Sequence, residues 1–194
     1  MSNLPKLVFK YRSYTPIPFL LVMLIYQQAT IYSLVIGFLI ALCGESFRLW
    51  GVSYAGSETR TTGSVGGTFL VVSGPFGHLR NPLYLGNILL YFGIGVMSMA
   101  LFPYLQILAL LFFYVQYRII IKEEETYLEK TFGDSYEQYR NSVPRLIPQI
   151  KTYKDVNVEQ PKYNLNAGLK SERRSLQAFT TVTIILILLF IFTK

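Results

Sequence analysis

Long apolar segments separated by short polar ones constrain this chain more than any other feature. A helix needs about 20 mostly apolar residues to cross the hydrocarbon core of a bilayer. Apolar residues dominate segments 17–43, 83–99, 103–121 and 176–193. The first segment is too long for one crossing, and the polar residues 27–30 interrupt it. It therefore predicts a tight hairpin of two helices, the second continuing to about Ala55.

The composition supports the same conclusion. Only 15% of the 194 residues are charged, whereas soluble domains normally carry about 25%. The chain is too short to add a separate soluble enzyme domain to these apolar segments. We therefore predict an all-α fold, a polytopic integral membrane bundle of about five transmembrane helices with short cytoplasmic interfacial helices.

The basic residues flank the apolar segments and do not form a dense stripe. The net charge of +7 is therefore better explained by contact with membrane lipids than by nucleic acid, and no nucleic-acid partner is expected. The positive-inside rule predicts a cytoplasmic N-terminus, with most cations on the same side. A prokaryotic plasma membrane is favoured, with the endoplasmic reticulum as the alternative. The single cysteine, Cys43, supports neither a disulfide framework nor a thiolate metal cluster, and no metal site is expected.

The segments divide into three regions. Residues 1–150 are predicted to form a membrane-embedded domain, with a glycine-rich cytoplasmic loop at 56–82 and interfacial helices at 122–143. Residues 151–174 are predicted to be a basic linker, and residues 175–194 a C-terminal transmembrane anchor. The sequence predicts no oligomeric state.

Three motifs carry candidate chemistry, and all three fall on the predicted cytoplasmic side. The first runs from Gly74 to Gly86 and contains Arg80, Asn81 and Pro82 at a predicted helix start. The second is the acidic run 123–125, directly after the fourth apolar segment, and the third is the proline-flanked segment 143–148. A snorkelling arginine, a solvated acidic turn and a simple boundary are their structural alternatives. Together, arginines, carboxylates and aromatic rings suit a zwitterionic cofactor that contains a nucleoside.

With the leucine, tyrosine and glycine positions between them, these motifs resemble the isoprenylcysteine carboxyl methyltransferase and phospholipid methyltransferase superfamily over about residues 44–150. The resemblance implies S-adenosylmethionine as cofactor and a lipid or prenylated substrate that enters from the bilayer. It also implies roles for eight residues. The residues expected to act in catalysis are Arg80, Glu124 and Arg145, and those expected to form the cofactor pocket are His78, Asn81, Pro82, Tyr84 and Glu123. The family often has histidine where this chain has Asn81, which weakens any expectation of base catalysis at that position.

The resemblance favours carboxyl O-methylation of the isoprenylcysteine type. An acceptor carboxylate is already ionised and needs only a cation such as Arg80 or Arg145 to position it, whereas an amine acceptor needs a base such as Glu124. Three alternatives remain: an N-methyltransferase of phospholipid amines, an NADPH-dependent reductase of a sterol or enone lipid, and a membrane scaffold without catalytic activity.

Overall fold

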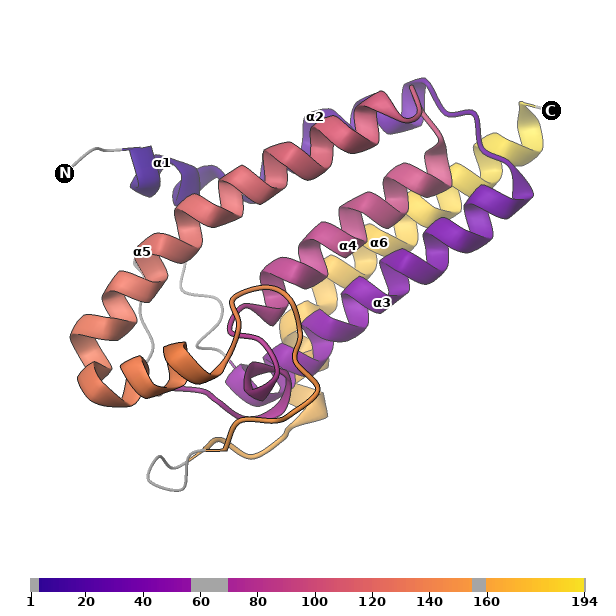
Figure 1. The fold of residues 1–194 in the computed structure, drawn as a ribbon. Helices are drawn as coiled ribbons and strands as arrows, with labels where there is room; N and C mark the ends of the chain where they lie inside the picture. Colours follow the sequence, from indigo (N-terminus) through magenta and orange to yellow (C-terminus); the bar gives the residue numbers. More distant parts are fainter. Residues whose placement is uncertain (1–3, 57–69, 155–159, 194) are drawn as a thin grey trace.

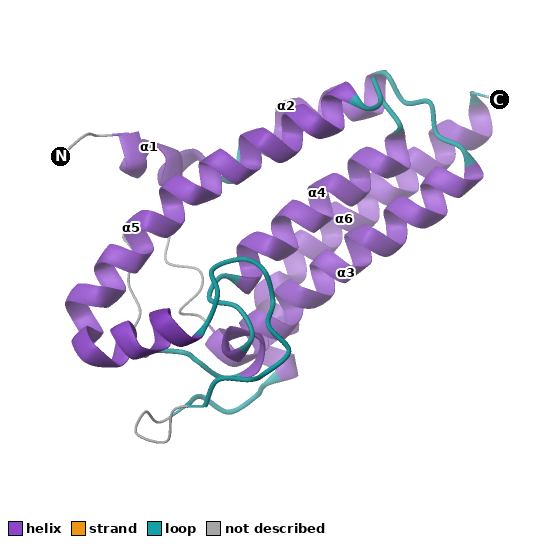
Figure 2. Ribbon diagram, viewed as in Figure 1, coloured by secondary structure: helices purple, strands orange, loops and turns teal. Residues whose placement is uncertain are grey.

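The computed structural model describes residues 4–56, 70–154 and 160–193, and every regular element in these ranges is helical (Figures 1 and 2). The elements are α1 Leu4–Tyr11, α2 Pro16–Ile25, α3 Ile31–Ala55, the 3-10 helix η2 Gly74–Gly77, α4 Pro82–Ser98, α5 Tyr104–Ser142 and α6 Leu165–Phe192. The predicted all-helical class is confirmed. The hairpin predicted over the first apolar segment is also present, formed by α2 and α3.

Helix length distinguishes the apolar helices from one another. Helices α3, α5 and α6 are long and apolar enough to cross a membrane. Helices α2 and α4 are apolar but have only 10 and 17 residues, fewer than the roughly 20 that a full crossing needs. Length therefore supports three of the about five predicted crossings, while the two shorter helices complete the bundle.

Two helix boundaries differ from the sequence prediction. The interfacial helices predicted at 122–143 are not separate from the fourth apolar segment, because α5 continues without a loop to Ser142 and only kinks at Gly133, where φ is +51° and ψ is −125°. Helix α6 begins at Leu165, so residues 165–174 are helical and the predicted linker is shorter. The Asn164 side chain caps this helix by accepting a hydrogen bond from the backbone N–H of Ala167, at 3.0 Å. The first turns of α6 contain several charged residues. The spacing of apolar residues alone therefore did not reveal that these turns are helical.

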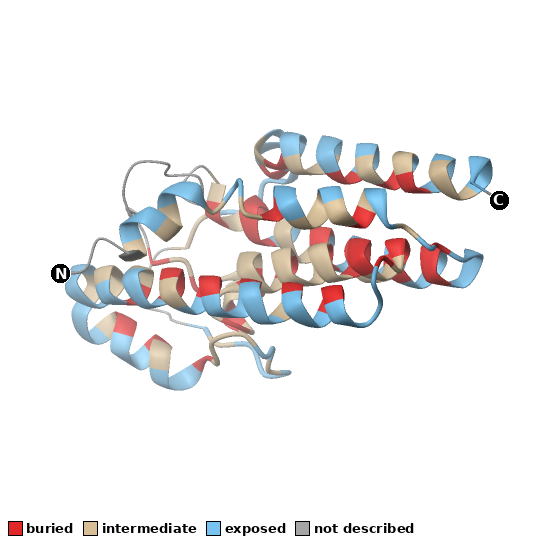
Figure 3. Cartoon of the chain, turned by 90° about the horizontal axis from the view of Figure 1, so that it is seen from above, coloured by how far each residue is buried: buried red, intermediate tan, exposed pale blue. Residues whose placement is uncertain are grey.

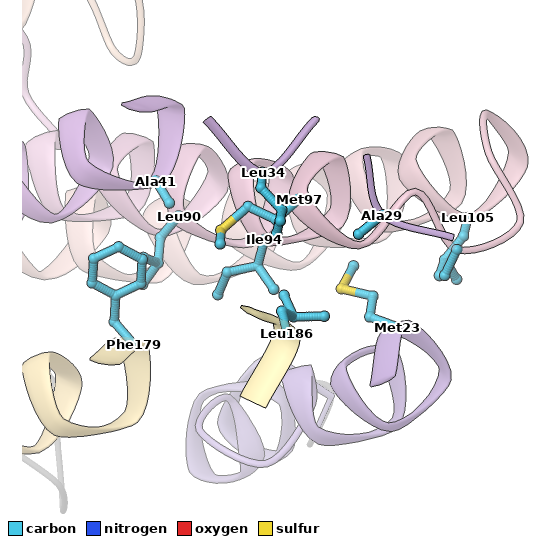
Figure 4. Close-up of a cluster of buried hydrophobic side chains, with 11 residues drawn as sticks. Met23, Ala29, Leu34, Ala41, Leu90, Ile94, Met97, Leu105, Phe179 and Leu186 are labelled. Carbon is cyan, nitrogen blue, oxygen red and sulfur yellow. The ribbon is translucent and has the colours of Figure 1, made fainter. Parts of the chain in front are cut away.

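The main core lies between α2, α3, α4 and α6. Figure 4 shows apolar side chains from these helices meeting, among them Met23, Leu34, Ile94 and Leu186. Figure 3 shows that buried positions lie on the inward faces, while exposed positions cover the outside. Much of that outside is large and apolar, for example Ile36 and Leu188, at 54% and 45% exposure. Such a surface is expected where lipid replaces water.

Helices α3 and α4 are in backbone contact through paired glycines. A Cβ atom on Gly93 would lie 2.4 Å from the backbone nitrogen of Ala41, and one on Gly37 would lie 2.5 Å from the Gly93 carbonyl oxygen. The same kind of contact recurs about two turns away along both helices, where Gly44 meets Gly86. Small residues of this kind let membrane helices pack closely.

Gly93→Ala should therefore destabilise the protein by about 1–3 kcal/mol, because the backbones must separate to admit one methyl group. Gly95→Ala is the matched control, since its nearest neighbour is the flexible end of Met23 at 3.1 Å. Thermal unfolding in detergent, followed by circular dichroism, measures both. Equal melting temperatures for the two variants would contradict the close helix contact.

Helix α5 stands apart from this compact group. Its N-terminal half lies beside α2, where the Phe19 ring contacts Phe112 and Phe113 at centroid distances of 5.2 and 5.3 Å. Figure 1 shows α3, α4 and α6 side by side and α5 diverging from them toward its C-terminal half. Residues 70–81, which precede α4, meet the segment that follows α5 at this end of the bundle, and the Arg80 backbone N–H donates to the Pro144 carbonyl oxygen there at 2.9 Å (Figure 2).

Candidate functional site

A cavity of about 740 Å³ lies where α5 diverges from the bundle. All six α-helices contribute to its wall, for example through Phe9, Arg48, Tyr84, Glu124 and Phe179. Its volume falls within the range of about 300–1,000 Å³ that is usual for small-molecule sites.

The wall of this cavity has two chemically distinct parts. The part near the start of α4 is polar and aromatic, and includes Arg80, Asn81, Tyr84, Glu124 and Tyr127. The part that extends between the helices is apolar and includes Leu20, Leu90, Ile94, Phe179 and Val182. The cavity can therefore hold a polar group at one end and a hydrocarbon chain at the other.

Glu125 joins the three motifs that the sequence singled out. Its Oε1 accepts hydrogen bonds from Nη2 and Nε of Arg80, at 2.8 and 3.1 Å. The Arg145 guanidinium binds the same carboxylate through Nε, at 3.1 Å, and through Nη2. One carboxylate on α5 thus ties the segment before α4 to the segment after α5. We call these three residues the Glu125 clamp.

The segment after α5 is held by backbone acceptors as well. Arg80 Nη1 donates to the carbonyl oxygens of Arg140 and Val143, at 2.7 and 2.6 Å. Asn81 is the N-cap residue of α4, but its side chain makes no cap hydrogen bond. Instead, Asn81 Nδ2 donates to the Arg145 carbonyl oxygen at 3.1 Å. Asn81 therefore occupies the N-cap position without capping the helix through its side chain, because the neighbouring segment competes for that side chain.

Tyr84 and Glu124 form a second pair across the cavity. The Tyr84 hydroxyl donates to Glu124 Oε1 at 2.5 Å. The Tyr84 ring packs against the Tyr117 ring, with 4.9 Å between centroids. The carboxylate is thus held at the cavity wall by a hydroxyl, with no direct ion pair to a cation among the described residues. Such a carboxylate can accept from a cationic or hydroxylated ligand.

The structure brings five of the eight predicted site residues to one cavity. These are Arg80, Asn81, Pro82, Tyr84 and Glu124. The other three lie outside its wall. Glu123 is exposed on the neighbouring face of α5, since successive helical residues point about 100° apart. Arg145 is part of the Glu125 clamp.

The His78 ring lies within hydrogen-bonding distance of the segment that follows the proline motif, outside the cavity wall. Its Nδ1 lies 2.9 Å from the Gln149 carbonyl oxygen, and its Nε2 lies 3.1 Å from the Thr152 hydroxyl. The Gln149 backbone N–H also donates to the His78 carbonyl oxygen at 2.9 Å. His78 therefore fixes the segment that follows the proline motif.

A buried ionic group on α3 and α6 was not predicted from the sequence. Arg48 donates to Glu172 Oε2 at 2.5 Å and to Asn87 Oδ1, and its Nε lies 3.6 Å from Glu45. Ser175 donates to the Glu45 carboxylate at 3.0 Å. Glu45 and Glu172 are only 3% and 1% exposed. Charged residues inside apolar segments are energetically costly and often functional. The positions of Glu45 and Arg48 within such a segment could therefore have indicated this group from the sequence.

The sequence comparisons fit this architecture. Residues 32–135, more than half of the chain, match the phospholipid methyltransferase family, and the chain belongs to that family. The superfamily resemblance stated from the motifs is confirmed.

Two curated proteins are similar to parts of the chain. The cobalt-zinc-cadmium resistance protein CzcN of Cupriavidus metallidurans is 31% identical over 107 residues, which cover 55% of this chain and 45% of that protein. The protein-S-isoprenylcysteine O-methyltransferase of Schizosaccharomyces pombe is 37% identical over 81 residues, which cover 42% of this chain and 34% of that protein. The matched region thus spans less than half the length of either relative.

Proposed function

We propose that this protein transfers a methyl group from S-adenosylmethionine to a hydrophobic acceptor, with carboxyl O-methylation of an isoprenylcysteine-type lipid favoured. The observation that carries the proposal is the two-part cavity, in which the Tyr84–Glu124 pair adjoins an apolar space between helices. The family match and the S. pombe relative support the same reaction class. The charge asymmetry around the apolar segments favours a cytoplasmic position for the polar end.

The polar end has the groups that the cofactor needs. The chemistry supplied by S-adenosylmethionine is an electrophilic methyl group on a sulfonium. Glu124 offers a carboxylate to its cationic groups, and the aromatic rings of Tyr84, Tyr117 and Tyr127 line the same wall. Tyr136 also lines the cavity, and its hydroxyl is buried without a hydrogen-bond partner among the described residues. A bound nucleoside hydroxyl or amine would satisfy it.

The acceptor chain fits the apolar end of the cavity. Side chains of α2, α4 and α6, such as Leu20, Ile94 and Val182, surround this space. A prenyl group placed there would exclude water from the reacting atoms and bring the acceptor group toward Glu124. Alignment and desolvation of this kind are the main requirements of methyl transfer, which needs no covalent enzyme intermediate. We assign the Glu125 clamp a positioning role, because both Arg80 and Arg145 donate hydrogen bonds to Glu125 and are thereby engaged within the protein.

Incubation of the purified protein with isotope-labelled S-adenosylmethionine tests the proposal directly. The acceptors are N-acetyl-S-farnesylcysteine, phosphatidylethanolamine and a total lipid extract, each in detergent micelles. We expect labelled methyl ester from the farnesylcysteine. Label on phosphatidylethanolamine would instead assign the phospholipid amine reaction, with Glu124 as the base. Binding of NADPH without binding of S-adenosylmethionine would overturn the proposal in favour of a reductase.

Glu124→Gln should raise the Kd for S-adenosylmethionine about 10- to 100-fold, because it removes the charge from an ionic hydrogen-bond acceptor. Tyr84→Phe should have a smaller effect in the same direction, since Glu124 then loses its 2.5 Å hydrogen bond. Equilibrium binding of labelled cofactor measures both. The control is Glu129→Gln, whose carboxylate is 50% exposed and forms a surface ion pair with Arg140. An unchanged Kd in Glu124→Gln would remove this residue from the cofactor site.

A further inference from the structure

Two of the arginines around the cavity are already neutralised by carboxylates. Arg80 is bound to Glu125 at 2.8 Å, and Arg48 is bound to Glu172 at 2.5 Å. Nη1 of Arg48 donates to Asn87 and Nη1 of Arg80 donates to two backbone carbonyl groups, while Nε of Arg48 lies 3.6 Å from a second carboxylate, that of Glu45. An anionic ligand would have to displace a protein carboxylate to reach either of them. Neither arginine is therefore suited to bind a ligand carboxylate.

The other two arginines that line the cavity are Arg12 and Arg174, and neither forms an ion pair within the described part of the chain. Arg174 is exposed on α6, whereas Arg12 is half-buried near the start of α2. Arg12 lies in the turn between α1 and α2 and lines the cavity together with Phe9. Its guanidinium carbon lies 3.7 Å from the centroid of the Phe9 ring, and Nη1 donates to the Phe9 carbonyl oxygen at 2.8 Å. Among the residues that the structure describes, no carboxylate forms an ion pair with it. Its position is thus fixed while its charge is not neutralised.

The turn around Arg12 is itself ordered by local hydrogen bonds. The Thr15 hydroxyl donates to the Arg12 carbonyl oxygen at 2.9 Å, and the backbone N–H of Tyr14 donates to the Tyr11 carbonyl oxygen at 2.9 Å. Arg12 lines the same cavity as Tyr84 and Glu124. A positive charge therefore lines the cavity that contains the Tyr84–Glu124 pair, where the reacting groups are proposed to meet.

We propose that Arg12 binds a ligand carboxylate in this cavity, an inference that rests on the methyl-transfer function proposed above. Two carboxylates can reach it: that of the acceptor and that of the amino-acid part of the methyl donor. Arg12 has the free charge and the planar donor geometry for either. The residue that orients the anionic group thus comes from the N-terminal turn, outside the three motifs and outside the region that matches the family.

Binding measurements with ligand pairs that differ only in the carboxylate test this role. The first pair is N-acetyl-S-farnesylcysteine and its carboxamide, and the second is S-adenosylmethionine and its decarboxylated analogue. The wild-type chain in detergent should prefer the acid of one pair about 10- to 100-fold, as expected for a charged hydrogen bond. In Arg12→Gln that preference should fall to near one. The pair that loses its preference identifies the source of the carboxylate, and Arg12→Lys should restore part of it.

Two matched variants make the assignment specific. Lys10→Gln removes a charge from the exposed end of α1 without altering the cavity, and should keep the wild-type preference. Arg174→Gln removes another cavity arginine, one that is exposed on α6, and should also keep it. If Arg12→Gln binds all four ligands as the wild type does, or if Arg174→Gln loses the preference instead, the role of Arg12 is refuted. If the wild type binds no S-adenosylmethionine and transfers no methyl group, the proposed function itself fails.

Discussion

Replacement of Glu125 by alanine should lower the stability of the protein by about 3–5 kcal/mol, because it leaves two arginines without their shared carboxylate. Arg80 and Glu125 have side-chain exposures of only 10% and 11%. The Glu125 clamp also joins the start of α4 to the segment after α5, so its loss should separate two walls of the cavity. We therefore expect methyl transfer to fall below detection in this variant.

Thermal unfolding in detergent measures the first effect, and the labelled-methyl assay measures the second. For a chain of this length, the stability loss corresponds to a fall in melting temperature on the order of 10 °C. Glu129→Ala is the control, since it removes a carboxylate from the same helix at a surface ion pair with Arg140, which is worth about 0–1 kcal/mol. A Glu125→Ala variant that melts with the control and keeps its activity would show that the clamp has no such role.

Glu172→Ala should have an effect of similar size on stability. Glu172 is 1% exposed, and its loss leaves the Arg48 guanidinium without its closest carboxylate, in the interior of the helix bundle. Breaking one side of a buried ion pair costs about 3–5 kcal/mol, whereas replacing both sides with apolar residues is often neutral. The triple variant Glu45→Met, Arg48→Met and Glu172→Met should therefore melt well above Glu172→Ala, because it leaves no charged member of this buried group without its partner.

The neighbouring Arg173 provides the control for this helix. It is exposed and adjacent to Glu172 in α6, so Arg173→Ala should melt within a few degrees of the wild type. A triple variant no more stable than Glu172→Ala would mean that Glu172 acts through contacts outside this ionic group. The result also decides whether α6 is a structural part of the bundle or the simple anchor that its sequence predicted.

The sequence predicted the helices better than their ends. The apolar segments predicted helices α2 to α6, because the length of an apolar run is a local property that can be read directly from the sequence. The kink within α5 falls at Gly133, because its positive φ strongly favours glycine. The start of α6 was missed by ten residues, because its first turns carry Arg173, Arg174 and other polar residues that fit a linker equally well.

The candidate site was only partly predictable. The motif residues Arg80, Tyr84 and Glu124 share a cavity, as the positions of their segments relative to the membrane implied. Which of three consecutive glutamates faces inward depends on helix rotation, and the acidic run alone left that open. The structure turns Glu124 toward the cavity and Glu125 toward the two arginines, and leaves Glu123 exposed.

The sequence by itself determined that this chain forms a helical membrane bundle and that its polar motifs belong to one region, because hydrophobic length, charge asymmetry and motif spacing are local. Only the tertiary structure decided which charges are paired. Arg48 meets Glu172 across 124 positions of the chain, and Arg80 meets Glu125 across 45. Such pairings depend on how helices pack, not on spacing along the chain. These pairings neutralise the arginines of the motifs. Arg12, in the turn between α1 and α2, remains as the charge proposed to bind a ligand in the cavity that Glu124 lines.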